Sequence, residues 1–526
     1  MFPPRRWLLF WPTVINAICS LQAARILFIA PFDSHSQCAL MSPYVKGLVD
    51  HGHELTVMRA YKECMSIGNV TSIRIMDNHN IISDFEDIVF ESFVGTPGGK
   101  WSEMHSMANI MIKAGLNVLL NPEVQALMKS NVTFDLLILE AGYTDLLFGL
   151  ADHFNALLIG ISTCAADWNI NRLKDHGVSV MEEPIMPMGT QTSGSIWARL
   201  YNWYLTTEEW LLFEMIFLPK LQMVHDYFFG HLEQSFLEIR HSFCLMLLNQ
   251  HFSMFRARPN APGLVEVGGL HIPKEVPKLP RDLQVFIDEA EHGVIYFSMG
   301  VELKGKDLPA EILKTFLEIF ESIPQRIIWK FEGKPFENLT QNVYMAKFLP
   351  QLAILAHPNV KIFICHGGML SVIEAVYYGK PLLGLPVFFD QFRNFDVLVH
   401  DGMALVMNMN SFSGKELKRS IDRLINNTAF RDNAMAISQR FRDRPIHPLK
   451  SAIYWTEYVL RYKGAKHMRV PHSHIKFTEY YSLDKFLFLG LRLFFTVFTV
   501  YLAFSKWRCY LKYIIKFLNR FLPKFG

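Results

Sequence analysis

The stretch FLPQLAILAHPNVKIFICHGGMLSVIEAVYYGKPLLGLPVFFDQ, from Phe348 to Gln391, decides the fold of the C-terminal half of the chain. Its apolar run Lys361–Cys365 is typical of a buried strand, and Met369–Tyr378 is typical of a helix. The tripeptide His366-Gly367-Gly368 joins the two. A strand that turns through glycines into a helix leaves free backbone N–H groups at the helix N-terminus, where phosphate binds. The stretch therefore predicts an anion site at the carboxyl end of a parallel strand.

Polar and aromatic groups flank this anion site in the sequence. Ser371 and Glu374 are three residues apart, so they share one face of the predicted helix. Phe348 offers an aromatic ring, Gln351 an amide, and the pair Asp390-Gln391 a carboxylate with a second amide. A base, two phosphates, a ribose and a hexose would each find a partner among these groups. The segment therefore predicts a site for a nucleotide sugar.

Buried-strand patterns alternate with helical patterns through both halves of the chain. Such alternation predicts an α/β fold with parallel sheets covered by helices on both faces. We expect two doubly wound, Rossmann-like domains that face a cleft, because ligands of open parallel sheets bind at the carboxyl ends of the strands. The predicted strands are Arg25–Pro31, Leu55–Met58, Phe134–Leu139 and Ala156–Ile161 in the first domain, and Val294–Ser298, Arg326–Lys330, Lys361–Cys365 and Pro381–Leu385 in the second.

Both ends of the chain carry apolar segments that indicate a membrane protein of the secretory pathway. Arg5 and Arg6 precede the apolar run Trp7–Cys19, which is the layout of a signal peptide; an uncleaved signal anchor is the alternative. The run Phe486–Ser505 is long enough to cross a bilayer once, with a buried core helix as the alternative. Basic residues that follow a span stay cytoplasmic, so the body is expected in the lumen.

The last residues of the chain form a basic tail without an acidic residue. Arg508, Lys512, Lys516 and Arg520 recur every fourth residue, which places them in one stripe on a helix. We expect this stripe to lie on the cytoplasmic membrane surface; a merely solvated tail is the alternative.

A proline-rich stretch between Pro273 and Pro280 separates the two expected domains as a stiff linker. The expected segments are a signal peptide (1–23), an N-terminal domain (24–272), the linker (273–284), a C-terminal domain (285–440), a return helix with a membrane-proximal segment (441–485), a transmembrane helix (486–505) and a basic cytoplasmic tail (506–526).

Composition excludes several classes of function. The formal net charge of the 526 residues is only +3, so nothing favours nucleic acid as a partner. The seven cysteines form no CxxC pair, and their spacing predicts neither a zinc site nor a disulfide framework. Acceptor sequences for N-glycosylation fit a lumenal body and occur at Asn69, Asn131, Asn338 and Asn426.

The segment Phe348–Gln391 closely resembles the sequence of the UDP-glycosyltransferases, in particular the membrane-bound animal UDP-glucosyl- and UDP-glucuronosyltransferases, and its HGGMLS variant is arthropod-like. The resemblance extends over nearly the whole chain through FDLLILE, VEVGGLHI, VIYFSMG, WKFEG and YYSLD. It implies the GT-B fold, with an acceptor-binding N-terminal domain and a UDP-sugar-binding C-terminal domain. It also implies an inverting transfer that uses no metal and no cofactor, the UDP-sugar being a co-substrate.

The same resemblance implies a biological setting. The expected location is the endoplasmic reticulum membrane, as a single-pass type I glycoprotein with its body in the lumen. The expected acceptor is a small lipophilic compound, as in detoxification, and association with copies or relatives of the chain is open. The sugar is expected to be glucose, with glucuronate as the second candidate.

Residue roles carry over from the family position by position. For the donor, Phe348 would stack on uracil and Gln351 bind its edge, while His366, Gly367, Gly368 and Ser371 would contact the diphosphate. Glu374 would bind the ribose, and Asp390 and Gln391 the hexose. For catalysis, Glu140 would orient the histidine that serves as general base.

The chain departs from the family at the base itself. Gln37 stands where the family has its histidine, and an amide cannot accept a proton near neutral pH. His35, two residues upstream, is the candidate replacement. The alternatives are a mechanism without a base, a strongly acidic acceptor, or a weak or inactive enzyme. Val301 also replaces a serine that often contacts phosphate, and Leu370 stands where many relatives have asparagine.

Two functions follow from these residues. The first is transfer of a hexose from a UDP-sugar to a hydroxyl of a lipophilic acceptor. The second is a non-catalytic member of the family that binds a UDP-sugar or a lipophile as a sensor, carrier or partner.

Overall fold

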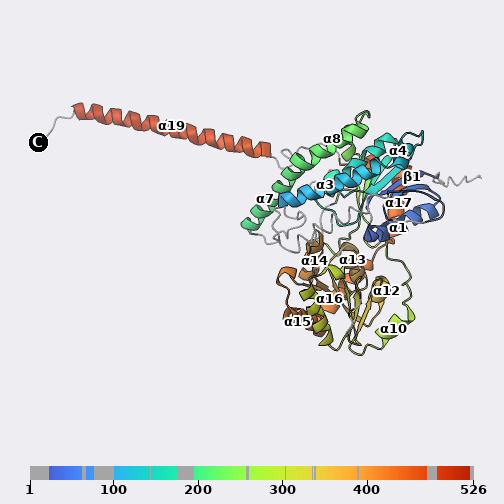
Figure 1. Ribbon diagram of the computed structural model, residues 1–526. Helices are drawn as coiled ribbons and strands as arrows, with labels where there is room; N and C mark the ends of the chain where they lie inside the picture. The colour runs from blue at the N-terminus through green and yellow to red at the C-terminus, as the bar shows by residue number, and fades with distance from the viewer. Residues whose placement is uncertain are drawn as a thin grey trace, which may run out of the picture. The chain divides into compact units, whose positions relative to one another are not determined.

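The computed structural model describes residues 23–32, 34–61, 67–75, 100–142, 144–174, 195–255, 260–301, 304–334, 336, 339–387, 390–470 and 483–521. The chain divides into two compact units, Met1–Val470 and Pro471–Gly526. The first unit contains two parallel sheets with their covering helices (Figure 1). The predicted α/β class with two Rossmann-like domains is confirmed.

The first sheet has seven parallel strands in the order β3-β2-β1-β4-β5-β6-β7. The order reverses between β1 and β4, which is the crevice where doubly wound sheets bind ligands. Its strands are β1 (Arg25–Ala30), β2 (Glu54–Arg59), β3 (Val70–Arg74), β4 (Leu136–Glu140), β5 (Leu157–Ser162), β6 (Leu245–Leu248) and β7 (Leu264–Glu266).

The second sheet repeats this topology with six parallel strands in the order β10-β9-β8-β11-β12-β13. The reversal now lies between β8 and β11, and β11 is the strand that ends at Cys365. The strands are β8 (Val294–Ser298), β9 (Arg326–Lys330), β10 (Val343–Ala346), β11 (Val360–Cys365), β12 (Leu382–Gly384) and β13 (Ala404–Val406).

Both faces of each sheet are buried, which explains the continuous apolar runs in the sequence. On β1, Leu27 and Ile29 join one core cluster while Ile26 and Phe28 join another. The second sheet divides its side chains between two further clusters in the same way. The structure also has five short strands that the sequence did not predict, and all except β6 lie at sheet edges: β3, β6, β7, β10 and β13.

Helices cover these faces (Figure 1). In the first domain they are α1 (His35–Asp50), α3 (Lys100–Leu119), α4 (Pro122–Met128), α5 (Gly149–His153), α6 (Trp168–Leu173), α7 (Ile196–Leu212), which continues through a π turn into α8 (Leu218–Phe229), and α9 (Phe236–Arg240). In the second domain they are α10 (Arg281–Asp288), α11 (Ala310–Glu321), α12 (Gln351–Ala356), α13 (Met369–Tyr377), α14 (Asp390–His400), α15 (Gly414–Asn426) and α16 (Thr428–Arg442).

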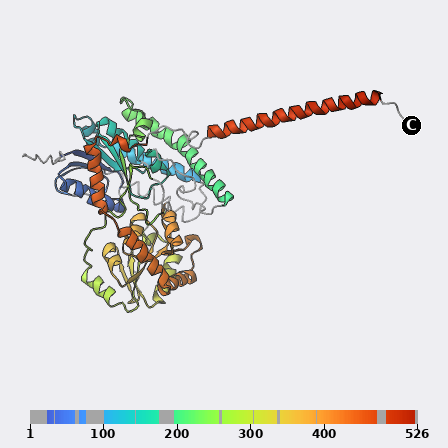
Figure 2. The ribbon, with the colours of Figure 1, turned by 180° about the vertical axis from the view of Figure 1, so that it is seen from behind.

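Helix α17 (Pro448–Arg461) returns from the second domain to the first, where it lies beside the blue α1 (Figure 2). Its side chains Ala452 and Ile453 belong to the core of the first sheet. Gly47 on α1 allows the close approach, because a Cβ there would lie 2.6 Å from Cδ1 of Ile453. The end of the second domain is therefore anchored in the core of the first.

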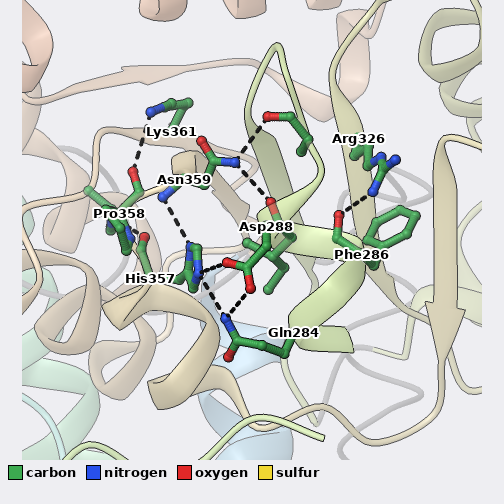
Figure 3. Close-up of polar contacts among 11 residues, drawn as sticks. Gln284, Phe286, Asp288, Arg326, His357, Pro358, Asn359 and Lys361 are labelled. Carbon is green, nitrogen blue, oxygen red and sulfur yellow. Dashed lines mark hydrogen bonds and ion pairs between the residues drawn. The ribbon is translucent and has the colours of Figure 1, made fainter. Parts of the chain in front are cut away.

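The amino end of β11 is fastened to α10 by a cluster of polar side chains (Figure 3). Nε2 of His357 lies 3.0 Å from Oδ1 of Asp288, which also accepts a hydrogen bond from Gln284 through its other oxygen. Asn359 donates to the carbonyl oxygens of Ile287 and Ala290. The helix that follows the linker is thus held at the end of β11 opposite His366.

The second unit contains one long helix, α19 (Leu483–Phe521). Its candidate membrane span has a mean hydropathy of 2.0. At about 1.5 Å per residue it is about 58 Å long, roughly twice the hydrocarbon thickness of a bilayer. The helix continues through the basic residues, so the expected boundary at 505 between span and tail is not a helix boundary. The expected signal peptide, apart from Ala23, lies outside the described residues.

Candidate functional site

The turn between β11 and α13 has the geometry that its glycines predicted. Gly367 has a φ of +95°, and a Cβ there would lie 2.4 Å from the Phe395 ring and 3.2 Å from the Gln391 carbonyl oxygen. Gly368 caps α13, and its carbonyl oxygen accepts the hydrogen bond of the Val372 N–H. The first N–H groups of α13 therefore point out of the end of the helix, as an anion site requires.

The ring of His366 is wedged between two glycines. A Cβ at Gly300 would lie 2.4 Å from the ring, and one at Gly368 would lie 2.5 Å from Nε2. Burial, helped by the charge of Lys330, lowers the pKa of His366 to about 4. The imidazole is therefore neutral at pH 7, and its Nδ1 has no hydrogen-bond partner among the described residues.

A polar network stands behind this turn and joins the predicted nucleotide contacts. The Tyr296 hydroxyl donates to Oε1 of Gln351 at 3.0 Å. Nε2 of Gln351 donates to Oε2 of Glu374 at 2.8 Å and to the Ser371 hydroxyl at 3.1 Å. His271 Nε2 lies 3.1 Å from the other Glu374 oxygen. Gln351, Ser371 and Glu374, named from the sequence, are thus brought together, while Tyr296 and His271 were not foreseen.

Phe348 lies just before α12 and its side chain is 84% exposed. An apolar ring of that size gains little by facing water, whereas a stacked base would cover it. Its role toward uracil stays a prediction.

The pair Asp390-Gln391 opens α14, and Asn394 ties it to the glycine turn. Nδ2 of Asn394 donates to Oδ2 of Asp390 at 2.8 Å and to the carbonyl oxygen of Gly367 at 2.9 Å. Gln391 accepts a hydrogen bond from the Val387 N–H at 2.8 Å. Burial raises the pKa of Asp390. The predicted hexose contacts are therefore fixed relative to the predicted diphosphate site.

A family model described as UDP-glucoronosyl and UDP-glucosyl transferase matches residues 178–521, which include every part of this donor site. The chain belongs to this family. UDP-glycosyltransferase UGT5 of Dactylopius coccus is 32% identical over 492 residues, or 91% of each chain. UDP-glucuronosyltransferase 2B13 of Oryctolagus cuniculus is 36% identical over 256 residues, or 48% of each chain.

Solved glycosyltransferases share the fold. The structure of glycosyltransferase VinC in complex with DTDP has a TM-score of 0.57 at 17% identity and covers 83% of this chain and 100% of its own. Spinosyn rhamnosyltransferase SpnG complexed with thymidine diphosphate has a TM-score of 0.54 at 16% identity, covering 82% and 100%. The chain therefore has the GT-B fold that the resemblance implied.

Gln37, which the sequence places at the expected position of the family's base, lies in the first turn of α1. Nε2 of Gln37 donates to Oε1 of Glu140 at 2.9 Å, and the Thr163 hydroxyl donates to the same oxygen at 2.8 Å. His35 is exposed, with Nδ1 3.3 Å from the Tyr61 hydroxyl. The structure thus brings Gln37, and not His35, to Glu140. Within the described ranges, the side-chain oxygen of Gln37 and the second carboxyl oxygen of Glu140 have no hydrogen-bond partner.

The burial of Glu140 should couple the stability of the protein to pH. Burial raises the pKa of Glu140 from 4.5 to about 8, so between these values the folded chain holds a proton that the unfolded chain releases. The stability that protonated Glu140 contributes to the folded chain is complete below pH 4.5 and is lost as the pH rises through about 8. The unfolding temperature of the wild type, in detergent, should therefore fall relative to that of Glu140→Gln between about pH 5 and 8.5.

The Gln variant is the matched control for this effect, because its amide keeps the shape and cannot ionise. One proton contributes at most about 1.4 kcal/mol per pH unit to the difference in the free energy of unfolding. If the unfolding temperatures of the two proteins changed in parallel with pH, Glu140 would be ionised in the folded state.

The segment after β5 links the two halves of the site. Thr163 donates a hydrogen bond to Glu140, and the next residue, Cys164, lies beside Asp390. Arg393 on α14 donates to the carbonyl oxygen of Ala166 at 3.1 Å. Glu140 of the first domain and Asp390 of the second therefore lie on either side of one short segment. No sequence pattern singled out this segment, because its contacts are all distant in the chain.

The other departures from the family have local structural consequences. Val301 is exposed, while the preceding Gly300 carbonyl oxygen accepts a hydrogen bond from the Lys330 ammonium at 2.6 Å. The Lys330 ammonium group thus lies beside the turn at which a serine was expected from the resemblance. Leu370 packs against the core of the first domain, so it makes an apolar contact between domains.

The remaining predictions concern covalent chemistry and metals. Asn69, Asn131 and Asn426 are exposed, whereas Asn338 lies outside the described residues. Cys38 on α1 is disulfide-bonded, which the scattered cysteine spacing did not predict. In the part of the chain that the structure describes, no three His, Cys, Asp or Glu side chains could hold a metal ion together.

Proposed function

We propose that this chain transfers a hexose from a UDP-sugar to the hydroxyl of a small lipophilic acceptor, with inversion at the anomeric carbon and without a metal. The observation that carries the proposal is the donor network, in which the N-terminus of α13, His366 and the Gln351–Glu374 pair converge. The family of the chain supports the same reaction.

In this proposal the diphosphate binds the N–H groups after Gly368 and the neutral ring of His366. Glu374 accepts hydrogen bonds from the ribose, while Phe348 and Gln351 hold uracil. Asp390 and Gln391 bind the hexose hydroxyls. Fixed donors at a helix N-terminus would stabilise the charge that develops on UDP as it leaves.

Charge near Asp390 supports glucose over glucuronate. Asp167, Asp390 and Asp396 lie near Arg393, so three carboxyl groups surround one guanidinium. Burial raises the pKa of Asp390 and of Asp167, which indicates that this region already disfavours negative charge. A uronate would add another carboxylate there, whereas glucose is neutral.

The acceptor proton needs a base, and we propose His35 for this role with Glu140 as the group that stabilises its charged form. The acceptor oxygen forms a bond to the anomeric carbon, the bond to UDP breaks, and the proton passes to the imidazole. His35 must then leave Tyr61 and approach Glu140. The side-chain oxygen of Gln37 and the second oxygen of Glu140 lack a partner among the residues that the structure describes, which supports an acceptor hydroxyl beside them.

Replacing His35 with alanine is therefore expected to lower the turnover number by about 10²–10⁴-fold, the usual contribution of general base catalysis. UDP release from UDP-glucose with a panel of phenols, sterols and lipids measures it. The control is His400→Ala, because His400 is exposed at the end of α14. Turnover that survives His35→Ala would remove His35 from the role proposed here.

The second candidate function is a non-catalytic member of the family that binds UDP-sugar or a lipophile. The hydrogen bond from Gln37 to Glu140 favours it, because the Glu140 carboxyl group is then held by an amide, which cannot take a proton. Binding of UDP without turnover on any acceptor would support this candidate.

We propose a location in the endoplasmic reticulum membrane, with the body in the lumen and α19 as the single span. The exposed sequons and the disulfide of Cys38 support an oxidising, glycosylating compartment. Sensitivity of the expressed chain to an endoglycosidase tests this location, and a chain without glycans would contradict it.

A further inference from the structure

One hydrogen bond joins the donor site to a residue that lies outside the C-terminal domain. His271 Nε2 lies 3.1 Å from Oε1 of Glu374, and the two residues are 103 positions apart in the chain. Both are buried, with 8% of His271 and 7% of Glu374 exposed. The contact therefore belongs to the interior, where a hydrogen bond to a carboxylate is costly to lose.

The position of His271 is fixed from both sides. Leu270 belongs to the core of the first domain, while Ile272 belongs to the core of the second. Two tight turns hold this crossing, since the N–H of Leu270 donates to Val267 and the N–H of Ile272 donates to Gly269. The imidazole thus projects from the point where the chain passes from one domain core to the other.

The carboxylate of Glu374 is held by both of its oxygens. Gln351 donates to Oε2 at 2.8 Å, and His271 contacts Oε1. Both Glu374 oxygens accept in these contacts, so Nε2 of His271 is assigned as the donor. Each oxygen has two acceptor sites, so one site on each remains for an incoming hydroxyl. Neighbouring ribose hydroxyls would meet an acceptor already turned toward them.

We propose that His271 is a positioning residue for the nucleotide: it holds the Glu374 carboxylate in the orientation that accepts the ribose hydroxyls. The inference rests on the proposed function, because it assumes that UDP binds at α13. Ribose recognition by the C-terminal domain would then depend on His271, which lies just before the linker and outside that domain. A carboxylate held in place loses less side-chain entropy on binding, which increases affinity.

The test compares two nucleotides on the full chain in detergent by calorimetry. UDP carries both ribose hydroxyls, and 2′,3′-dideoxy-UDP carries neither. We expect the wild type to prefer UDP by about tenfold or more, since the hydroxyls bond to a charged group. His271→Ala should lower the affinity for UDP and leave that for the dideoxy nucleotide unchanged. The preference should then approach that of Glu374→Ala, with no further loss in the double variant.

A conservative variant separates positioning from folding. His271→Gln places an amide N–H near the position of Nε2, so it should retain most of the preference for UDP. If His271→Ala fails to fold, the Gln variant is compared with His271→Leu, which fills the space without a donor. An equal loss of affinity for both nucleotides, or an unchanged preference, overturns the inference. If the wild type does not bind UDP, the proposed donor site at α13, and with it the proposed function, is contradicted instead.

Discussion

Replacing Gln37 with histidine should raise the rate of hexose transfer. Nε2 of Gln37 already lies 2.9 Å from Glu140, so an imidazole at this position would have the Glu140 carboxyl group beside it, and a positive charge on the imidazole would favour the ionised carboxylate. A histidine held in this way can accept the acceptor proton, and its charged form would be stabilised. General base catalysis contributes about 10²–10⁴-fold, which sets the upper limit of the rise in turnover number.

The size of the rise in turnover number also measures how well His35 acts as the general base in the natural chain. A small rise is expected where His35 is the base, and a rise from no activity would favour the non-catalytic function. The matched control is Gln37→Asn, which keeps the amide and adds no base. Turnover that is unchanged or lower in a folded Gln37→His protein would mean that position 37 is not beside the acceptor.

Replacing Gly368 with alanine should lower the affinity for UDP by about tenfold or more, or at least about 1.4 kcal/mol. The backbone itself tolerates the change, because φ at Gly368 is −58°. The new Cβ, however, would lie 2.5 Å from Nε2 of His366, and Gly300 blocks the other face of the ring. The ring must therefore shift away from the N-terminus of α13, where the diphosphate is proposed to bind.

The control is Gly142→Ala, because no atom lies within 4 Å of a Cβ at that position. Calorimetry with UDP measures the effect, and thermal unfolding checks that both variants fold. If Gly368→Ala binds UDP as tightly as the control does, the ring of His366 does not contribute to the diphosphate site.

Most of the fold could be predicted from the sequence because its parallel strands are buried on both faces. Val294–Ser298 and Arg326–Lys330 form strands with the predicted bounds, because an apolar run between turns is buried most fully as a strand inside a parallel sheet. The short strand β13 escaped prediction, because three residues carry no periodicity. The disulfide of Cys38 escaped because pairing depends on distance in space and not on spacing in the chain.

The donor site was likewise predictable in its local parts and unpredictable in its long-range ones. The glycine turn and the Ser371–Glu374 face follow from residues that are close in sequence. Three further residues complete the site through hydrogen bonds to residues from 23 to 103 positions away, and no local pattern marks them: Asn394, Thr163 and His271.

The sequence by itself determined the two parallel sheets, the C-terminal apolar helix and the family, because apolar periodicity and short glycine motifs are local properties. Only the tertiary structure decided which side chain stands beside Glu140. Both His35 and Gln37 lie in the first turn of α1, and an α-helix turns by about 100° per residue, so the direction of that helix relative to β4 selects between them.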